Sequence, residues 1–423
     1  MRFLLPLFCV VAINEAALTA PEQVMIAATE HYSELVITWV TFDSTSTSQV
    51  LYGLTGEPLW NVAYGSETEF VHKEGKNPLT RYIHRVNLTN LLPLIKYDYI
   101  CGSPANWSKL FTTRTLGDGT SPTTLAVFGD MGYKNGQSIP WLISEATNGT
   151  IDGVLHCGDI AYNLFNDGGR NGDDFINAIE RISSKVPYMV APGNHEWLHN
   201  FSDYRYRFSM PGNTSNGYYS WNVGSAHIIS LTTEIYFFLW DGIDLIKEQY
   251  DWLVQDLQKA TSEEQRAKYP WIITMAHHPM YCSTTDEDDC NHRDSVVRVG
   301  LPVIHKYGLE SLFYEYGVDV ALWGHEHIYE RLWPVYDYKV MNGTNPYHNT
   351  LAPVHIISGA AGCREGRDLF MDHQPDWAAF ISREYGYSKM TIHNITHLSI
   401  DQISISQNGT VIDTVTLSKD PPI

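Results

Sequence analysis

Basic residues and long apolar stretches are both scarce in this sequence of 423 residues. Lys and Arg number 28 against 48 Asp and Glu, which gives a net charge of −20 with neutral histidines. A surface of that sign repels phosphate backbones and anionic membranes, so we expect no nucleic acid and no membrane as partners. Beyond the N-terminus, no run approaches the roughly eighteen apolar residues of a membrane helix. With 43% hydrophobic and only 18% charged residues, the chain is predicted to fold into two or three globular domains.

Cysteines are also few, six in all, and no Cys-x-x-Cys pair is present, which argues against a structural zinc site. Cys9 lies in an apolar N-terminal leader, so five remain in the mature chain and at least one must be free or intermolecular. Cys282 and Cys290 bracket a short acidic loop, and we expect them to form a bridge. Cys157 lies within an apolar run and is predicted to be an inert buried thiol.

The first residues, MRFLLPLFCVVA, place one Arg before an apolar stretch that is too short to span a bilayer. We predict a signal peptide over residues 1–17; a buried N-terminal strand is the alternative. The mature protein is then expected to be extracytoplasmic, either secreted or lysosomal. A high density of N-linked glycosylation motifs supports that location. These Asn-x-Ser/Thr motifs stand at Asn87, Asn106, Asn148, Asn200, Asn213, Asn342, Asn394 and Asn408.

The hydrophobic pattern changes once along the chain. Residues 21–115 contain short segments of β-branched and aromatic residues separated by turn residues, which predicts a small β-sandwich. A Gly-, Ser- and Pro-rich linker over 115–122 ends this domain. Over 122–423 apolar runs alternate with helical periodicity, which indicates an α/β domain. From about Met390 the alternation of a sheet returns, and we expect strands there that complete a sheet edge.

Polar residues of one chemical kind follow five of the apolar runs, in the blocks GDMG, GDIAY, GNHE, HHP and GHEH. Because the carboxyl ends of the strands in an open α/β sheet form the ligand crevice, these side chains are expected to converge. A glycine precedes the polar residue in four of the five blocks, where a sharp turn needs a permissive backbone. The candidate ligands are Asp130, Asp159, Tyr162, Asn194, His277, His325 and His327.

Carboxylate, amide, phenol and imidazole donors suit iron, manganese or zinc, and the set contains no thiolate. Seven donors are too many for one tetrahedral ion and fit two ions that share a bridging carboxylate, for which Asp159 is the natural candidate. Any one block alone is more often a turn, a helix cap or a core pair, so the combination carries the inference. The acidic run at 286–289 is interpreted as a solvated loop rather than a calcium site.

These blocks resemble those of the purple acid phosphatases, the binuclear-metal branch of the metallophosphoesterases, and look most like the long-form animal members. The stretch from Tyr385 to Leu398 is similar to their C-terminal part. The resemblance covers nearly the whole mature chain. It implies an α/β catalytic domain, a metallophosphoesterase-like β-sandwich flanked by helices, at 122–423, preceded by an all-β fibronectin type III-like domain at 21–115.

The resemblance also implies a division of the ligands between two metal ions. Asp159 would bridge a ferric ion and a divalent iron, zinc or manganese ion. A phenolate ligand needs a strong Lewis acid, because the reference pKa of tyrosine is about 10, and a ferric ion meets that need. Calcineurin-like phosphoesterases typically carry a ligand His two residues after the first Asp, where this chain has Gly132. The ferric ligands would be Asp130, Tyr162 and His327, and the divalent ligands Asn194, His277 and His325.

By the same resemblance, the expected activity is that of an acid phosphatase: a metal-bound hydroxide attacks a small phosphate monoester. His195, beside a ligand, would orient or protonate substrate oxygens, and His292 is a second candidate for that catalytic role. Glu196 and Glu326 are expected to orient neighbouring groups. One alternative is a phosphodiesterase or nucleotide-pyrophosphate hydrolase with two divalent ions. Another is a glycoprotein that binds a partner through its β-sandwich and keeps a vestigial metal site.

Overall fold

The computed structural model describes residues 18–72, 79–239 and 242–421. The predicted signal peptide therefore lies outside the described residues. Among the helices that are described, none is both long enough and apolar enough to cross a membrane.

The N-terminal part is built from two antiparallel sheets, as predicted. Its core lies between them and includes Ile37 and Trp39 from one sheet and Val50, Tyr99 and Cys101 from the other. Alternation along each strand places these apolar side chains on the inner face. The first sheet contains, in order, β1 (Glu22–Ala28), β2 (Leu35–Thr41), β6 (Leu79–Leu88) and β5 (Ser66–His72). The second contains β4 (Asn61–Tyr64), β3 (Gln49–Leu54), β7 (Lys96–Ser103) and β8 (Asn106–Trp107), with β9 (Phe111–Arg114) paired to β7.

Two larger sheets form the rest of the chain. The first has the order β12 (Tyr188–Ala191), β11 (Gly153–Cys157), β10 (Thr123–Phe128), β24 (Gly386–Ile392), β25 (His397–Ser404), β26 (Thr410–Ser418). The second has the order β13 (Tyr219–Val223), β14 (Ala226–Ser230), β15 (Trp271–Met275), β18 (Val320–Trp323), β22 (Val354–Ser358), β19 (Tyr329–Leu332), β23 (Ala378–Ser382). The strands after Met390 form the edge of the first sheet, as the alternating pattern predicted.

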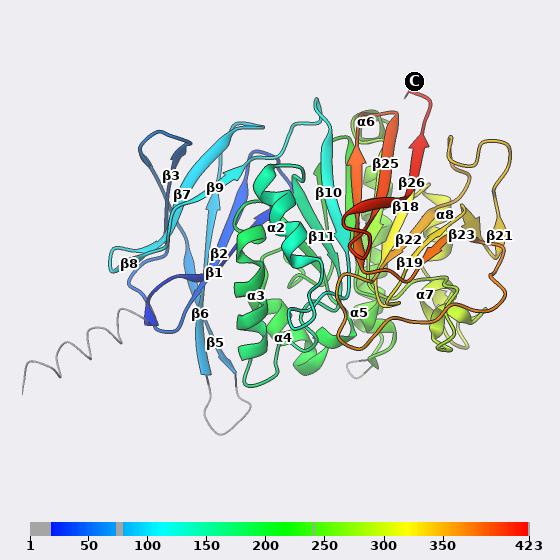
Figure 1. Cartoon of the computed structure of the whole chain (residues 1–423), viewed down its shortest axis with the longest axis horizontal. Coiled ribbons are helices and arrows are strands. Elements are labelled where there is room, and N and C mark those ends of the chain that lie inside the picture. Colours follow the sequence, from blue (N-terminus) through cyan, green and yellow to red (C-terminus); the bar gives the residue numbers. More distant parts are fainter. Residues whose placement is uncertain (1–17, 73–78, 240–241, 422–423) are drawn as a thin grey trace, which may run out of the picture.

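Helices and short strands surround these sheets (Figure 1). The helices are α2 (Ile139–Asn148), α3 (Arg170–Ser183), α4 (Leu198–Arg207), α5 (Asp244–Ala260), α6 (Glu263–Lys268), α7 (Val296–Val299) and α8 (Glu310–Glu315). Three short 3₁₀ turns are η1 (Asn194–Glu196), η2 (Glu234–Tyr236) and η4 (Asp289–Asn291). Two two-stranded ribbons complete the elements: β16 (Gly300–Leu301) with β17 (Lys306–Tyr307), and β20 (Val335–Tyr336) with β21 (Lys339–Val340).

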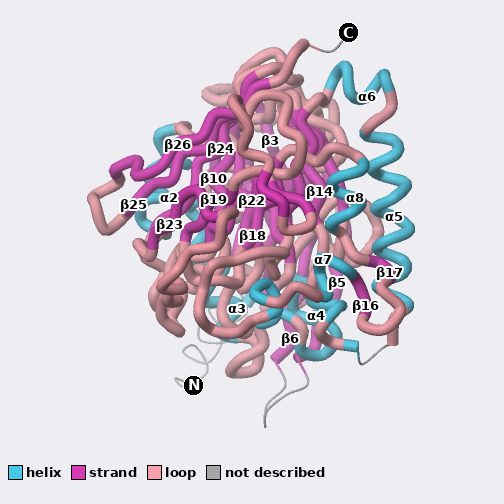
Figure 2. Tube along the Cα trace, turned by 90° about the vertical axis from the view of Figure 1, so that its right-hand side faces the viewer, coloured by secondary structure: helices cyan, strands magenta, loops and turns pink. Residues whose placement is uncertain are grey.

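The core explains the layering. Val127 and Met390 of the first large sheet share one buried cluster with Ile273 of the second, so the two sheets pack face to face. The opposite face of the second sheet packs on helices, because Trp323 of β18 shares another cluster with Leu253 of α5. Figure 2 shows α5 and α8 along that side of β14 and β18. The result is the predicted β-sandwich flanked by helices.

The N-terminal domain lies against the α/β domain through β1 and α3 (Figure 1). Ser183 of α3 donates a hydrogen bond to the Val24 carbonyl of β1 at 2.9 Å. Beside this contact, Arg81 of β6 and Arg207 of α4 both pair with the buried carboxylate of Asp173 on α3. Apolar packing and a buried ion cluster therefore join the two domains.

A buried histidine in this core makes stability depend on pH. His355 of β22 accepts the indole N–H of Trp323 at 3.0 Å, and burial lowers its pKa to about 3. The imidazole is neutral in the fold but becomes charged in the unfolded chain below about pH 6.5. Its full contribution to the free energy of unfolding is therefore present above that pH and is lost as the pH drops toward 3. Between pH 7.5 and 4.5 the loss from this one group is about 3 kcal/mol. We expect His355→Gln to remove this contribution from the difference in unfolding free energy between the two pH values. Urea unfolding at both pH values measures that difference.

His373→Gln, a change at an exposed histidine, is the control and is expected to leave the pH dependence as it is in the unsubstituted chain. An unchanged pH dependence in His355→Gln would contradict the assignment to this buried ring.

Candidate metal centre

The candidate ligands follow the carboxyl ends of strands from both large sheets. Asp130 follows β10, Asp159 follows β11 and Asn194 follows β12 in the first sheet. His277 follows β15 and His325 follows β18 in the second. The strands β10, β11 and β12 are parallel, as are β15 and β18, so their carboxyl ends meet at common edges. The convergence predicted from the sequence is therefore present.

The backbone is strained at several of these positions. Asp130, Asp159, Tyr162 and His325 all adopt positive φ, at 59°, 49°, 51° and 71°. For residues other than glycine this conformation costs free energy, and such residues cluster at functional sites. The turns after the strands are thus shaped to aim side chains inward.

Two glycines show what the turns require. Gly158 has φ +83°, as expected for a permissive backbone, and a Cβ there would meet His277 Nδ1 at 2.4 Å. Gly193 has an extended backbone, with φ −113°, but a Cβ would lie 2.2 Å from Asp159 Oδ1. The expected need for a permissive backbone is therefore seen at Gly158, whereas Gly193 is needed for the close approach of a candidate ligand.

One half of the cluster gathers around Asn194. Its Oδ1 lies 3.0 Å from His277 Nε2 and 3.2 Å from His325 Nδ1. The two imidazole nitrogens are 3.3 Å apart, and His277 Nε2 is also 3.3 Å from Asp159 Oδ1. Four potential metal-ligating atoms thus face one small volume.

The other half contains Asp130, Tyr162 and His327. Tyr162 Oη lies 3.1 Å from His327 Nε2, which is 3.5 Å from Asp130 Oδ1. That carboxylate oxygen is buried and has no hydrogen-bond partner among the described residues. Asp130, Asp159 and His277 offer ligand atoms within 4.8 Å of one another, which connects the two halves.

The outer nitrogen of each imidazole has its own partner. His277 donates its Nδ1–H to the Cys157 carbonyl at 2.9 Å. His325 donates its Nε2–H to Asp288, and the Sγ of Cys363 lies 3.1 Å from His327 Nδ1. A metal-ligating histidine typically uses its second nitrogen in this way, which fixes the tautomer and leaves the inner lone pair for the ion. The donor set therefore fits metal ions.

Electrostatics support the same fit. Burial alone would lower the pKa of His277, but the carboxylates of Asp159 and Asp130 outweigh it and raise that pKa well above the usual value. Burial would also lower the pKa of His327, but the nearby carboxylate of Asp130 and the side chain of Cys363 outweigh it and raise that pKa to about 12. Without a metal, protons on these rings offset the buried carboxylates. A metal cation can replace them, because binding releases ligand protons.

The phenol of Tyr162 is suited as a ligand to the more strongly Lewis-acidic of two metal ions. Burial, with the charges of Asp130 and Asp159, raises its pKa well above 10. Only a strongly polarising cation would ionise a phenol in this setting.

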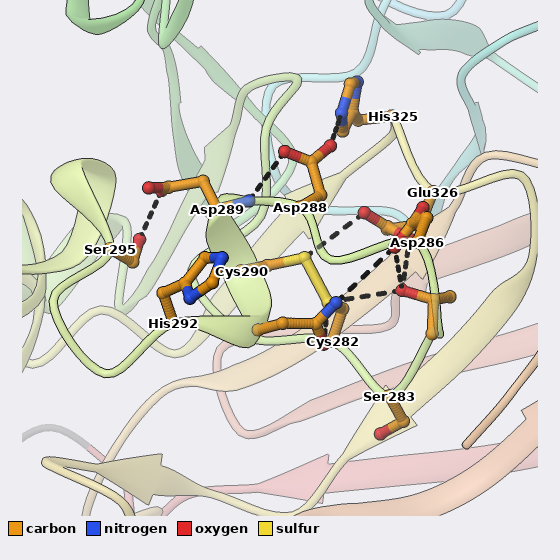
Figure 3. The surroundings of a disulfide bond; sticks show 12 residues. Cys282, Ser283, Asp286, Asp288, Asp289, Cys290, His292, Ser295, His325 and Glu326 are labelled. Atoms are coloured by element: carbon orange, nitrogen blue, oxygen red, sulfur yellow. Dashed lines mark hydrogen bonds and ion pairs between the residues drawn. A yellow bond between two sulfur atoms is a disulfide. The ribbon is translucent and has the colours of Figure 1, made fainter.

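The two predicted catalytic histidines differ in position. His195 donates its backbone N–H to Asp159 Oδ1 at 3.0 Å and its Nδ1–H to Asn163 Oδ1 at 2.8 Å, which leaves Nε2 near the cluster, 3.6 Å from Asp159 Oδ2. The ring of His292 is exposed, and its Nε2 lies 3.2 Å from the Glu287 carbonyl oxygen. Figure 3 shows it away from His325. The structure therefore brings His195 to the cluster and does not bring His292 there.

The two predicted orienting carboxylates are buried and bonded. Glu196 accepts the backbone N–H groups of Ile160 and Gly193 at 3.1 and 2.9 Å, which ties two ligand-bearing turns together. Glu326 accepts a hydrogen bond from Thr284 on the acidic loop. Both therefore hold loops around the cluster.

Several neighbours of the cluster are not evident in the sequence blocks. Asn163 orients His195, and Glu365 Oε2 lies 3.5 Å from the same ring. The guanidinium of Arg364 lies 5.7 Å from the ring centre of Tyr162. These residues come from loops, and only Asn163, directly after Tyr162, stood close enough in the sequence to suggest its role.

The cysteines follow the prediction. Cys282 and Cys290 form a disulfide (Figure 3), and Cys157 is a buried free thiol. Burial raises the pKa of Cys157 far above its usual value, which keeps the thiol inert. Cys101 and Cys363 are also free and buried.

Comparison with known families agrees with this architecture. The calcineurin-like phosphoesterase model matches residues 123–329, which contain all seven candidate ligands. The catalytic domain is therefore that of a metallophosphoesterase. Models of the purple acid phosphatase N-terminal domain and of an iron/zinc purple acid phosphatase-like C-terminal part match residues 21–115 and 352–414. The chain belongs to the purple acid phosphatase family of enzymes, and that family implies phosphoesterase activity and a binuclear metal centre.

Relatives and a solved structure extend the match over nearly the whole chain. Acid phosphatase type 7 from Danio rerio is 52% identical over 410 residues, which cover 95% of this chain and 92% of the relative. The Homo sapiens protein of the same name is 48% identical over 401 residues, covering 94% and 90%. A purple acid phosphatase from yellow lupin (Lupinus luteus) seeds shares the fold, with a TM-score of 0.79 at 23% identity over 95% of this chain and 75% of its own.

Proposed function

We propose that this chain is an acid phosphatase that hydrolyses small phosphate monoesters at a site holding a ferric ion and a divalent iron, zinc or manganese ion. One observation carries the proposal. Each of three imidazoles engages its outer nitrogen with a neighbour and turns the inner one toward buried carboxylates, an amide and a phenol. That arrangement suits two cations, which can replace the protons that otherwise offset the buried carboxylates.

The ligands divide by their position. Asp159 would bridge, since its Oδ1 faces His277 and one of its carboxylate oxygens lies within 4.8 Å of one from Asp130. When bound, the two ions would neutralise phosphate charge and lower the pKa of a water molecule so that it can attack phosphorus. The ferric ion would be held by Asp130, Tyr162 and His327, and the divalent ion by Asn194, His277 and His325.

His195 would supply the proton that the departing alcohol needs. Its Nδ1–H is fixed by Asn163, so Nε2 is the nitrogen that faces the substrate volume. The side chain is 18% exposed, enough for a phosphate ester to reach it. From that nitrogen a proton can pass to the departing alcohol oxygen, which is general acid catalysis. Because the ring of His292 contacts the Glu287 carbonyl of its own loop, we assign it no catalytic role.

The phenol provides the first test. We expect the metal-loaded protein to contain two metal ions per chain and to show a broad visible absorption from Tyr162 bound to ferric iron. Tyr162→Phe is expected to lose that absorption while keeping the fold. A visible spectrum combined with elemental analysis measures both.

Tyr133→Phe is the matched control, because Tyr133 bonds to Asp174 rather than to the cluster. Its spectrum is expected to be unchanged. Two divalent ions without iron, together with faster cleavage of diesters than of monoesters, would instead support a phosphodiesterase or nucleotide-pyrophosphate hydrolase.

We also propose that the protein carries N-linked glycans and is secreted or lysosomal, after removal of residues 1–17 as a signal peptide. Seven of the eight motif asparagines are exposed and can accept a glycan. Asn106 is half-buried and its Nδ2 donates to Thr19 Oγ1 at 2.6 Å, so it is the least suited. We place the domain boundaries at 21–115 and 122–423.

A further inference from the structure

The acidic run at 286–289 is predicted from sequence to be a solvated loop, but Asp288 and Asp289 do not fit that description. Asp286 and Glu287 are exposed, but the carboxylate of Asp288 lies against the candidate ligand His325 (Figure 3). Its Oδ2 accepts the Nε2–H of that ring, and its Oδ1 accepts the backbone N–H of Asp289 at 2.6 Å. Both oxygens are thus used.

The loop is anchored so that this contact is maintained. The disulfide between Cys282 and Cys290 closes its base. Asp289 accepts hydrogen bonds from the Ser295 hydroxyl at 2.6 Å and the Val296 backbone N–H at 3.1 Å, which fixes the far side of the loop on α7. Asp288 therefore sits between two fixed points.

Asp288 determines which nitrogen of His325 is free. The ring has one N–H in its neutral form, and donation of Nε2–H to Asp288 leaves the lone pair on Nδ1. That Nδ1 lies 3.2 Å from Asn194 Oδ1 and 3.3 Å from His277 Nε2, inside the divalent half of the cluster. One face of the His325 ring packs on the ring of His278, with centroids 3.7 Å apart, which limits its tilt but not its tautomer.

We infer that Asp288 is the positioning residue of the divalent-metal site: it holds His325 in the tautomer that presents Nδ1 to the ion. The inference rests on the proposed function, since it concerns a metal ligand of that site. Removal of such an outer partner typically weakens metal affinity by about 10- to 100-fold. Because Asp288 bonds to His325, which lies in the divalent half of the cluster, the loss is expected to be selective.

Metal content and affinity test the inference. Asp288→Ala, loaded with iron and zinc and titrated with a zinc chelator, is expected to bind zinc about 10- to 100-fold more weakly and to keep its iron and the Tyr162 absorption. Asp288→Asn retains an oxygen acceptor, so its zinc affinity is expected to lie between those of Asp288→Ala and the unsubstituted protein. Retained iron and absorption show in the same sample that the fold survives.

Glu287→Gln and Asp286→Asn remove the same charge from exposed neighbours and are the matched controls, expected to stay within twofold. Zinc affinity in Asp288→Ala equal to that of the unsubstituted protein would overturn the inference, as would an equal loss in the controls, which would assign the effect to loop charge. An unsubstituted protein that binds no pair of metals would instead contradict the proposed function, so the two failures are distinguishable.

Discussion

Asp159→Asn is expected to lower kcat/KM for a phosphate monoester by about three orders of magnitude, equivalent to about 4 kcal/mol of transition-state stabilisation. The carboxylate faces His277 in one half of the cluster and lies beside Asp130 of the other, so it is the group best placed to bridge two cations. An amide is nearly the same size but carries no charge and cannot bridge in the same way. Steady-state kinetics of the metal-loaded protein, with metal content measured on the same sample, tests this.

The control is Asp167→Asn, which removes a carboxylate from a nearby loop where the side chain is 75% exposed. We expect its activity to stay within twofold. Near-normal turnover in Asp159→Asn with both metals bound would refute the bridging role. Lost activity together with loss of the folded circular-dichroism spectrum would mean that the residue acts through stability.

Much of the fold could be predicted because buried parallel strands appear in sequence as continuous apolar runs. The runs at 125–128, 154–157 and 188–191 lie within β10, β11 and β12. The amphipathic period around Leu253 likewise indicates a helix, and α5 spans this residue. Local pattern could not supply the strand order, such as the placement of β22 between β18 and β19, because long-range pairing leaves no local trace.

The candidate ligands could be predicted for a related reason: turns after strands have a common direction. The partners of those ligands could not. Asp288 and Asp286 are two residues apart in one acidic run, and only the closed loop decides that the first reaches His325. His292 shows the converse, since the 3₁₀ turn η4 places its ring on the Glu287 carbonyl. Loop conformation is a tertiary property, and residue type alone does not reveal it.

Tertiary placement also gives Asp173 its importance. Its carboxylate accepts two hydrogen bonds from Arg81, at 2.7 and 2.6 Å, and one from Arg207 at 2.8 Å, and all three side chains are buried between the domains. Burial alone would raise the pKa of Asp173, but the two guanidinium groups outweigh it and lower that pKa. The stabilisation is therefore present above the unfolded-state pKa of about 4 and lost as the pH falls through the lower folded value.

Asp173→Ala is accordingly expected to reduce the free energy of unfolding by about 3–5 kcal/mol at neutral pH, because it removes the carboxylate partner of the buried Arg81 and leaves the buried Arg207 with Asp203 alone. Urea unfolding measures this, and Asp174→Ala, at the next and exposed helix position, is expected to cost less than about 0.5 kcal/mol. Combining Asp173→Ala with Arg81→Met should recover part of the loss, since one unpaired charge is removed with it. A cost below about 1 kcal/mol, or no recovery in the double variant, would mean that other groups, such as Asp203 or water, compensate the two arginines rather than Asp173.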